Sequence, residues 1–218
     1  MPKFSIIVPH YDGVVSDAML LRCFASLAAQ TCTDFDVLLY HDGPLSRPLP
    51  PLPDCGQGIR VIVTEARAND FGHSLRHRGI QEASGDYLLH LNADNLLYVQ
   101  ALATLAAAAD APVEPAPAAE MRDNPQVLVF AILMRGRRFN GRVGFWRDRH
   151  ATQTGLIVTG VPPQSGFIDC MQLVASRELW TRIGGWYDRS EESDGLIYEQ
   201  MIADHGARYV PAVLGEHW

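Results

Sequence analysis

Short apolar runs alternate with helical patterns through the first half of the chain. Residues 4–11 read FSIIVPHY, a β-branched run that predicts a buried strand. Residues 16–31 carry apolar side chains at helical spacing, and Ser16 or Asp17 can cap that helix. The same reading predicts further strands at 35–43, 59–66 and 86–92, and further helices at 74–83 and 98–109. This order is typical of an open, parallel α/β sheet covered by helices on both faces.

The second half is less regular. It predicts strands at 125–136, 166–175 and 208–215, helices at 177–188 and 193–207, and a hairpin turn at Asn140-Gly141. Residues 110–120 are rich in Ala and Pro, and we expect them to form a mobile surface loop rather than a linker. A chain of 218 residues suits a single domain over residues 1–218.

Composition narrows the class of protein. The chain is 47% hydrophobic and 20% charged, as in ordinary soluble proteins, and its net charge of −7 argues against nucleic acid as a partner. No apolar run reaches the about 18 residues of a membrane helix, and no secretion signal is visible. The four cysteines have neither CxxC nor zinc spacing, which favours reduced thiols in a cytoplasm. These observations predict a cytoplasmic protein, and peripheral contact with the inner membrane face stays open.

Polar clusters follow three of the predicted strands. In open α/β sheets, ligands bind beyond the carboxyl ends of the strands, so these clusters together predict one site. Neither a GxGxxG nor a GxxxxGK[ST] motif is present, so bound phosphates would be held by a metal or by cations. The clusters are Pro9-His10-Tyr11-Asp12, His41-Asp42-Gly43 and Asn92-Ala93-Asp94-Asn95.

The order of these motifs resembles family-two glycosyltransferases. The matching segments are SIIVPHY, the His-Asp-Gly turn, LRHRGIQEASGDYLLHLNADN, IGGWYD at 183–188, SEESDG at 190–195 and the C-terminal histidine. The resemblance implies the GT-A fold, a three-layer α/β/α arrangement with a mixed, mainly parallel sheet. It also implies a nucleotide-binding half at residues 1–105 and an acceptor-binding half at 125–218.

The resemblance also implies roles for residues of the first half. Pro9, with His10 and Tyr11, would flank the nucleotide base, and Asp42 would hydrogen-bond it. Arg76 matches a helix arginine near the base and the phosphates, while His77 stands where the family usually has Asn. Asn92-Ala93-Asp94 occupies the family's Asp-x-Asp position. Asn92, with Ala93, would face the ribose, because an amide oxygen can replace a carboxylate as hydrogen-bond acceptor.

Metal and base roles follow from the same resemblance. Asp94 matches the family's metal-binding carboxylate, and His217 matches a histidine that completes the metal shell in some members. Together with phosphate and water oxygens, these two side chains would be sufficient ligands for Mn²⁺ or Mg²⁺. Asp194 takes the general-base position, with Glu191 and Glu192 as rivals. Because Asp194 lies at a helix N-terminus, we expect its pKa to be lowered.

The implied enzyme is a hexosyltransferase-type glycosyltransferase of cell-envelope polysaccharide biosynthesis. It would move a sugar, inverting its configuration, from a nucleotide-sugar donor such as a UDP-sugar to a small-molecule, glycan or lipid-linked acceptor; a homo-oligomer stays open. Two alternatives also stay open: a sugar-phosphate nucleotidyltransferase and a non-catalytic nucleotide- or glycan-binding relative. A nucleotidyltransferase should have a cationic loop after its first strand, and this sequence has none there. The non-catalytic alternative is retained because Asn92 stands where the family has a carboxylate.

The basic stretch between the predicted strands has two interpretations. It is either a solvated hairpin or a clamp for an anionic acceptor, because Arg side chains suit phosphate geometry. Its members are Arg135, Arg137, Arg138, Arg142, Arg147 and Arg149.

Overall fold

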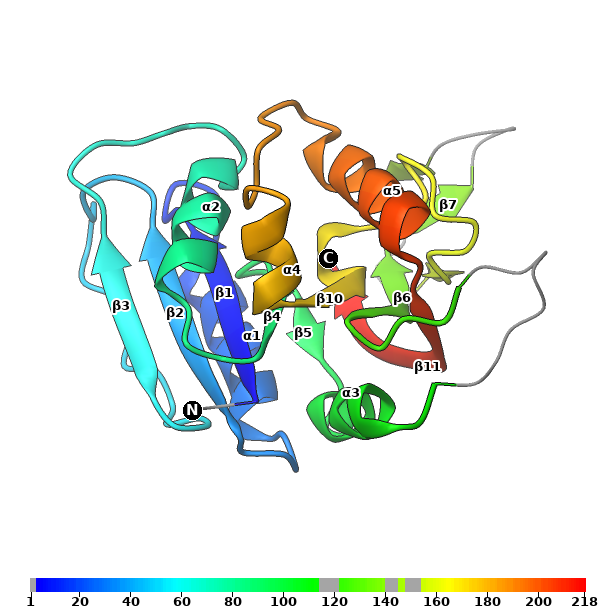
Figure 1. Cartoon of the computed structure of the whole chain (residues 1–218). Helices are drawn as coiled ribbons and strands as arrows, with labels where there is room; N and C mark the ends of the chain where they lie inside the picture. Colours follow the sequence, from blue (N-terminus) through cyan, green and yellow to red (C-terminus); the bar gives the residue numbers. More distant parts are fainter. Residues whose placement is uncertain (1–2, 114–121, 140–144, 148–153) are drawn as a thin grey trace.

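A computed structural model describes residues 3–113, 122–139, 145–147 and 154–218. A sheet of nine strands runs through it in the order β3-β2-β1-β4-β10-β6-β11-β5, with β9 paired to β6 (Figure 1). Strands β7 (Arg137–Phe139) and β8 (Phe145–Arg147) form a separate antiparallel pair. The Asn140-Gly141 turn predicted between them lies outside the described residues, as does most of the predicted loop at 110–120.

The first half of the chain confirms the predicted β-α-β order. Strands β3, β2, β1 and β4 lie side by side and are parallel. The elements are β1 (Phe4–His10), α1 (Asp17–Ala28), β2 (Phe35–His41), β3 (Ile59–Val63), α2 (His73–Glu82) and β4 (Tyr87–His90).

The second half continues the sheet with mixed strand directions. Strand β10 runs antiparallel to both β4 and β6, whereas β11 is parallel to β6. The elements are β5 (Leu96–Leu97), α3 (Ala101–Asp110), β6 (Val127–Arg135), β9 (Gly155–Val158), a 3₁₀ turn (Cys170–Gln172), β10 (Leu173–Ser176), α4 (Arg177–Arg182), α5 (Ser193–His205) and β11 (Arg208–His217).

Two apolar cores cover the two faces of the sheet, which gives the predicted three layers. Alternate side chains of β1 point to opposite faces, so Phe4, Ile6 and Val8 enter one core and Ile7 enters the other. Helices α1 and α3 close the first core, and α2, α4 and α5 close the second. None of the described helices is long and apolar enough to cross a membrane.

Some element boundaries differ from the predicted ones, and the following differences have identifiable physical reasons. The strand expected at 166–175 starts only at Leu173, because Asp169 caps a 3₁₀ turn by accepting the N–H of Met171 at 3.1 Å. The helix expected at 177–188 ends at Arg182, and Gly184 and Gly185 follow with left-handed φ angles of 87° and 76°. The last strand runs on to His217, because the short, unpredicted strand β5 pairs with Gly215 and Glu216, and β6 pairs with His217 through Met134.

Ser16 caps α1, as the sequence predicted, by accepting the N–H of Met19 at 3.3 Å. We expect Ser16→Ala to lower the free energy of unfolding by about 1 kcal/mol. That loss corresponds to a melting temperature lower by about 2–4 °C for a chain of this size. Thermal unfolding measures it, and Ser16→Asp, which retains a capping oxygen, should unfold close to the wild type. An unchanged melting temperature in Ser16→Ala would contradict the assignment.

Candidate active site

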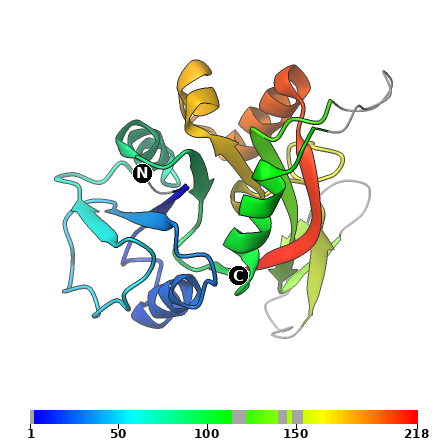
Figure 2. The same ribbon diagram turned by 60° about the horizontal axis from the view of Figure 1, so that its bottom comes forward.

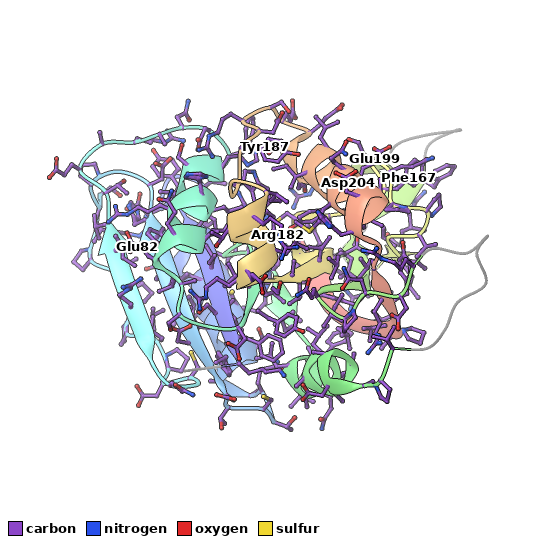
Figure 3. The ribbon with its side chains drawn as sticks, viewed as in Figure 1. Glu82, Phe167, Arg182, Tyr187, Glu199 and Asp204 are labelled. Carbon is purple, nitrogen blue, oxygen red and sulfur yellow. The ribbon has the colours of Figure 1, made fainter. Side chains whose placement is uncertain are left out.

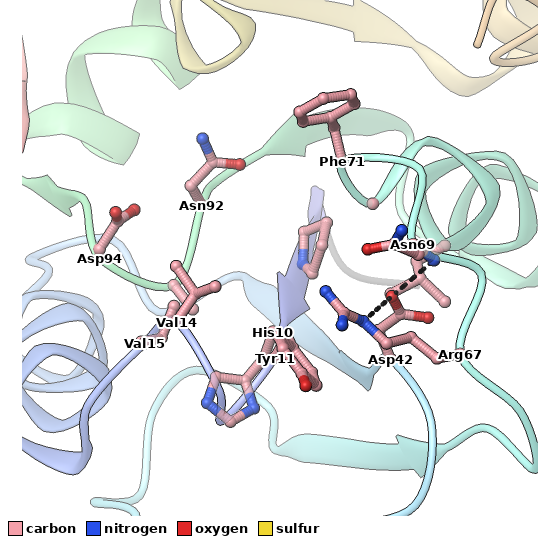
Figure 4. Close-up of a pocket in the computed structure, with 14 residues that line it drawn as sticks. His10, Tyr11, Val14, Val15, Asp42, Arg67, Asn69, Phe71, Asn92 and Asp94 are labelled. Atoms are coloured by element: carbon pink, nitrogen blue, oxygen red, sulfur yellow. Dashed lines mark hydrogen bonds and ion pairs between the residues drawn. The ribbon is translucent and has the colours of Figure 1, made fainter. Parts of the chain in front are cut away.

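The three predicted polar clusters meet at one edge of the sheet. Strands β2, β1 and β4 are parallel neighbours, so their carboxyl ends lie together. They surround a cavity of about 550 Å³, which we call the donor cavity (Figure 4). Its walls are Pro9, His10, Tyr11, Val14, Val15, Asp42, Arg67, Asn69, Phe71, Gly72, Leu75, Asn92, Ala93 and Asp94.

One end of the donor cavity is organised by Asp42. Its carboxylate accepts the backbone N–H groups of Ala68 and Asn69, at 2.7 and 3.1 Å, and lies 3.6 Å from the guanidinium of Arg67. That guanidinium covers the ring of Tyr11, 3.6 Å from its centroid. Asp42 therefore fixes the β3–α2 loop (residues 64–72), a second function that the sequence did not indicate.

His10 forms part of the cavity wall. Its ring is almost fully buried, and its Nδ1 has no hydrogen-bond partner within the described structure. Burial, reinforced by the neighbouring His41 ring, lowers the pKa of His10 to about 4. The imidazole is therefore neutral at physiological pH and can accept or donate one hydrogen bond to a bound ligand.

Arg76 lies behind the cavity and does not line it. Its buried guanidinium donates to Oδ1 of Asn92 and, at 2.8 Å, to the carbonyl of Phe71. Arg76 therefore lies next to the cavity and supports two of its lining residues, Asn92 and Phe71. Since Arg76 occupies the amide oxygen of Asn92, the amide N–H₂ of Asn92 is the group left to bond a ligand.

Asp94 lies at the opposite end of the cavity from Asp42 (Figure 4). Burial raises the pKa of its carboxyl, and the nearby His217 opposes that shift. The backbone carbonyl of Asp94 accepts a hydrogen bond from Arg22 at 2.6 Å. This bond anchors the backbone of the turn after β4 from which the carboxylate extends.

Strand pairing brings His217 to this end of the cavity. Glu216 of β11 is the partner of Leu96 in β5, two residues beyond Asp94. The backbone N–H of Trp218 donates to Asn95 at 3.1 Å, and Arg22 stacks on the Trp218 ring at 4.1 Å. Figures 1 and 2 show the C-terminus in the middle of the molecule, between its two halves. The proximity of His217 to Asp94 thus depends on β5, which the sequence analysis missed.

A second cavity, also of about 550 Å³, adjoins the first half of α5, and we call it the acceptor cavity. Phe167, one of its lining residues, lies beside α5 and β7 (Figure 3). All three candidate bases line it. The full set is Met134, Arg137, Val158, Ser165, Gly166, Phe167, Ile168, Asp169, Glu191, Glu192 and Asp194.

The prediction of a lowered pKa for Asp194 was wrong. Burial, reinforced by the nearby Asp169 carboxylate, raises the pKa of Asp194 to about 6. The N–H of Gly195, 2.8 Å away, and the charge of Arg76 oppose this shift but do not offset it. A carboxyl with this pKa accepts a proton more readily than an exposed one, so Asp194 is better suited to base catalysis than the sequence indicated.

Asp169 is a site residue that sequence reasoning missed. Its Oδ2 lies 3.4 Å from Nε2 of His217, and its charge contributes to the raised pKa of both Asp94 and Asp194. The signal available in the sequence was the Asp-x-x-Gln spacing of Asp169 and Gln172, typical of a capped turn. The composition of residues 166–175 instead predicts a strand, which places Asp169 in its interior.

The basic stretch divides between structural and site roles. Arg135 forms a two-pronged ion pair with Glu216, at 2.8 Å through each nitrogen, and so supports β11. Arg137 lines the acceptor cavity. Arg142 and Arg149 lie outside the described residues. Trp180 and Trp186 are fully buried in the second core, where they serve packing.

The donor set around Asp94 fits a divalent cation that is also held by phosphates. Within the described residues, no group of three or more His, Cys, Asp or Glu side chains could hold a metal alone. Mn²⁺ and Mg²⁺ need only one or two protein ligands when phosphate and water oxygens supply the rest. Nδ1 of His217 is buried without a hydrogen-bond partner, which suits an imidazole available as a ligand.

Comparison with solved structures supports the fold. S. aureus TarS aligns over 99% of this chain and 36% of its own, with 18% identity and a TM-score of 0.67. A mannosyltransferase from Pyrobaculum calidifontis, in complex with GDP-Man and Mn²⁺, aligns over 99% of this chain and 56% of its own, with 12% identity and a TM-score of 0.62. The sheet and its covering helices are thus the GT-A arrangement expected from the sequence.

Comparison with characterised sequences identifies the family. A PGL/p-HBAD biosynthesis glycosyltransferase of Mycobacterium bovis is 37% identical over 102 residues, 44% of this chain and 37% of the relative. The amylovoran biosynthesis glycosyltransferase AmsB of Erwinia amylovora is 31% identical over 98 residues, 43% of this chain and 31% of the relative. The matches therefore cover less than half of either relative. The model of the family described as Glycosyl transferase family 2 matches residues 5–128, more than half of the chain, and the chain belongs to that family.

Proposed function

We propose that this chain transfers a sugar from a nucleotide-diphosphate donor to a hydroxyl group of an acceptor, with inversion and with help from a divalent metal. The observation that carries the proposal is the junction between the two cavities. Asp94 ends the donor cavity, Asp169 and Asp194 line the acceptor cavity, and His217 interacts with both Asp94 and Asp169. A sugar at this junction would lie between a phosphate site and a base.

The donor cavity suits a nucleoside diphosphate by its composition. The base would lie near Arg67, Asn69 and Asp42, which line one end of the cavity, and the diphosphate would lie near Asp94 at the other end. Structures related in fold are described in complex with UDP, with UDP-GlcNAc and with GDP-Man, which makes sugar nucleotides of these classes the first donors to test. The relatives named above are glycosyltransferases of PGL/p-HBAD biosynthesis and of amylovoran biosynthesis, which makes a biosynthetic glycosyl transfer the setting to test for an acceptor.

Asp94 and His217 would hold the divalent ion, with Asp169 beside the imidazole. When bound there, such an ion would stabilise the negative charge that develops on the leaving nucleoside diphosphate. The charge of Asp169 would keep the His217 ring oriented, since Nε2 lies 3.4 Å from that carboxylate. Mn²⁺ suits the mixed carboxylate and imidazole donors better than Mg²⁺ does.

Asp194 would act as the general base. It would take the proton of the acceptor hydroxyl as the acceptor oxygen attacks the anomeric carbon from the face opposite the leaving group. The bond from that carbon to the phosphate oxygen breaks, and its electron pair leaves with the nucleoside diphosphate. Glu191 and Glu192 line the same cavity but are exposed, so they are better placed to bind acceptor hydroxyls.

The pH dependence of transfer follows from the raised pKa of Asp194. The base must be ionised, so at saturating Mn²⁺ the rate should increase with pH up to about 6 and level off above it. Below that value the rate should fall about tenfold per pH unit, since only the ionised fraction reacts. Initial rates measured across this range test the assignment. A rate that stays constant as pH falls well below 6 would contradict it.

The proposed function is tested by a transfer assay with the full chain. Purified protein is incubated with UDP-, GDP- and CDP-sugars, Mn²⁺ and a panel of glycan and lipid-linked acceptors, and release of the nucleoside diphosphate is measured. We expect release from one donor class that depends on both acceptor and metal. Thermal unfolding with each nucleotide and Mn²⁺ is measured alongside. If no donor releases its nucleoside diphosphate and no nucleotide shifts the melting temperature of the protein, the proposal is overturned.

A further inference from the structure

Phe71 is an exposed aromatic residue on the rim of the donor cavity. It belongs to the β3–α2 loop, lines the cavity and leaves 68% of its surface exposed. Val14, 73% exposed, lines the same cavity. Single exposed apolar side chains are common on proteins, so exposure alone assigns no function to Phe71.

The backbone of Phe71 gives a second, independent observation. Its φ is 57°, in the left-handed region that bulky residues rarely adopt. The conformation is held from both sides: Asp42 bonds the N–H groups of Ala68 and Asn69, and Arg76 donates to the carbonyl of Phe71. Strained residues fixed by their surroundings concentrate at ligand clamps.

The aromatic residue that the family resemblance assigned to the base is already covered. The Arg67 guanidinium occupies one face of Tyr11, 3.6 Å from the ring centroid. Gly13 packs so closely on the edge of the same ring that a Cβ there would overlap it. In Figure 4 the Phe71 ring lies above the cavity, apart from Tyr11 and Arg67.

We propose that Phe71, rather than Tyr11, is the aromatic surface on which the base of the donor nucleotide stacks. The inference rests on the proposed function, because it requires a nucleotide in the donor cavity. In this arrangement Tyr11 supports Arg67, whose donors face the edge of the base, while Phe71 covers the face of the base.

The surroundings of Phe71 support a preset orientation. The ring contacts His73 with centroids 6.0 Å apart, and His73 stacks on the buried Trp186 at 5.7 Å and 14°. Nε2 of His73 also lies 2.9 Å from the carbonyl of Ser190. The Phe71 ring thus rests on a side chain that is itself fixed, which limits the entropy lost when a base binds.

Binding to Phe71→Gly, Phe71→Tyr and the wild type tests this inference. The Gly variant removes the ring but adopts the left-handed backbone without strain, whereas the Tyr variant retains a stacking ring. Calorimetric titrations use UDP, GDP and CDP in the presence of Mn²⁺, and inorganic pyrophosphate with Mn²⁺ as a ligand without a base. Thermal unfolding of Phe71→Gly, expected at or above the wild-type temperature, shows that the variant is folded.

We expect Phe71→Gly to bind the preferred nucleoside diphosphate about tenfold more weakly or worse, as the loss of one base–aromatic stack implies. Phe71→Tyr should bind nearly as tightly as the wild type, and pyrophosphate should bind all three proteins equally. Equal nucleotide affinity for Phe71→Gly and the wild type would overturn the inference, as would an equal loss of pyrophosphate affinity. Absence of nucleotide binding by the wild type would instead overturn the proposed function itself.

Discussion

Asp194→Asn should lower the rate of sugar transfer by about 10²- to 10⁴-fold, the range that a general base contributes. The amide retains the size of the side chain and cannot accept the acceptor proton at neutral pH. Donor binding should be unchanged, because Asp194 lines the acceptor cavity and not the donor cavity. Initial rates at saturating donor, together with calorimetric donor titration, separate these two effects.

Stability provides an internal control for this variant. Burial raises the pKa of Asp194 to about 6, so above that pH the folded protein carries a buried carboxylate that is less well solvated than in the unfolded chain. Asp194→Asn should therefore unfold at neutral pH at the wild-type temperature or slightly above it.

The matched variants Glu191→Gln and Glu192→Gln alter exposed carboxylates of the same cavity and should lose far less activity. A loss in Glu192→Gln equal to that in Asp194→Asn would contradict the choice of base.

Asp94→Asn should remove most of the metal dependence of donor binding. The amide preserves the shape of the turn after β4, whose backbone is held by Arg22, but lacks the charge that attracts a divalent ion. Loss of an outer partner of a metal ligand costs about 10- to 100-fold in affinity, and loss of the ligand itself should cost at least as much. Titration of Mn²⁺ into the protein at fixed nucleoside diphosphate measures the change.

The control for Asp94→Asn is Asp54→Asn, an exposed carboxylate outside both cavities. It should bind Mn²⁺ and nucleotide like the wild type. His217→Gln should weaken metal binding less than Asp94→Asn does, because a neutral ligand contributes less than a charged one. If Mn²⁺ increases donor affinity equally in Asp94→Asn and the wild type, the metal site lies elsewhere.

The sequence predicted the donor edge of the sheet because that edge depends on local patterns. Each polar cluster directly follows a buried run, and parallel neighbours must bring those ends together. Pro9, His10, Tyr11, Asp42, Asn92, Ala93 and Asp94 accordingly all line one cavity. Arg76 lies behind the cavity wall. Its side chain is buried under the β3–α2 loop, which it supports by donating to the carbonyl of Phe71.

The errors concern properties that depend on distant parts of the chain. The pKa of Asp194 was misjudged because the helix N-terminus is visible in the sequence, whereas burial beside Asp169 is not. The meeting of His217 and Asp94 required β5, a two-residue strand too short to produce a periodic pattern. Asp169 was overlooked because its turn resembles a strand in composition. Long-range packing, and not local propensity, decided each case.

Calorimetric titration of the 218-residue chain with UDP, GDP and CDP, each with Mn²⁺ and again with the metal chelated, tests the central claim most directly. The proposed arrangement of a base-binding end near Asp42 and a phosphate end near Asp94 predicts that at least one of these nucleotides binds, and that chelation of the metal weakens its binding. Failure of all three to bind in the presence of Mn²⁺ would contradict the claim that this chain uses a nucleotide-sugar donor.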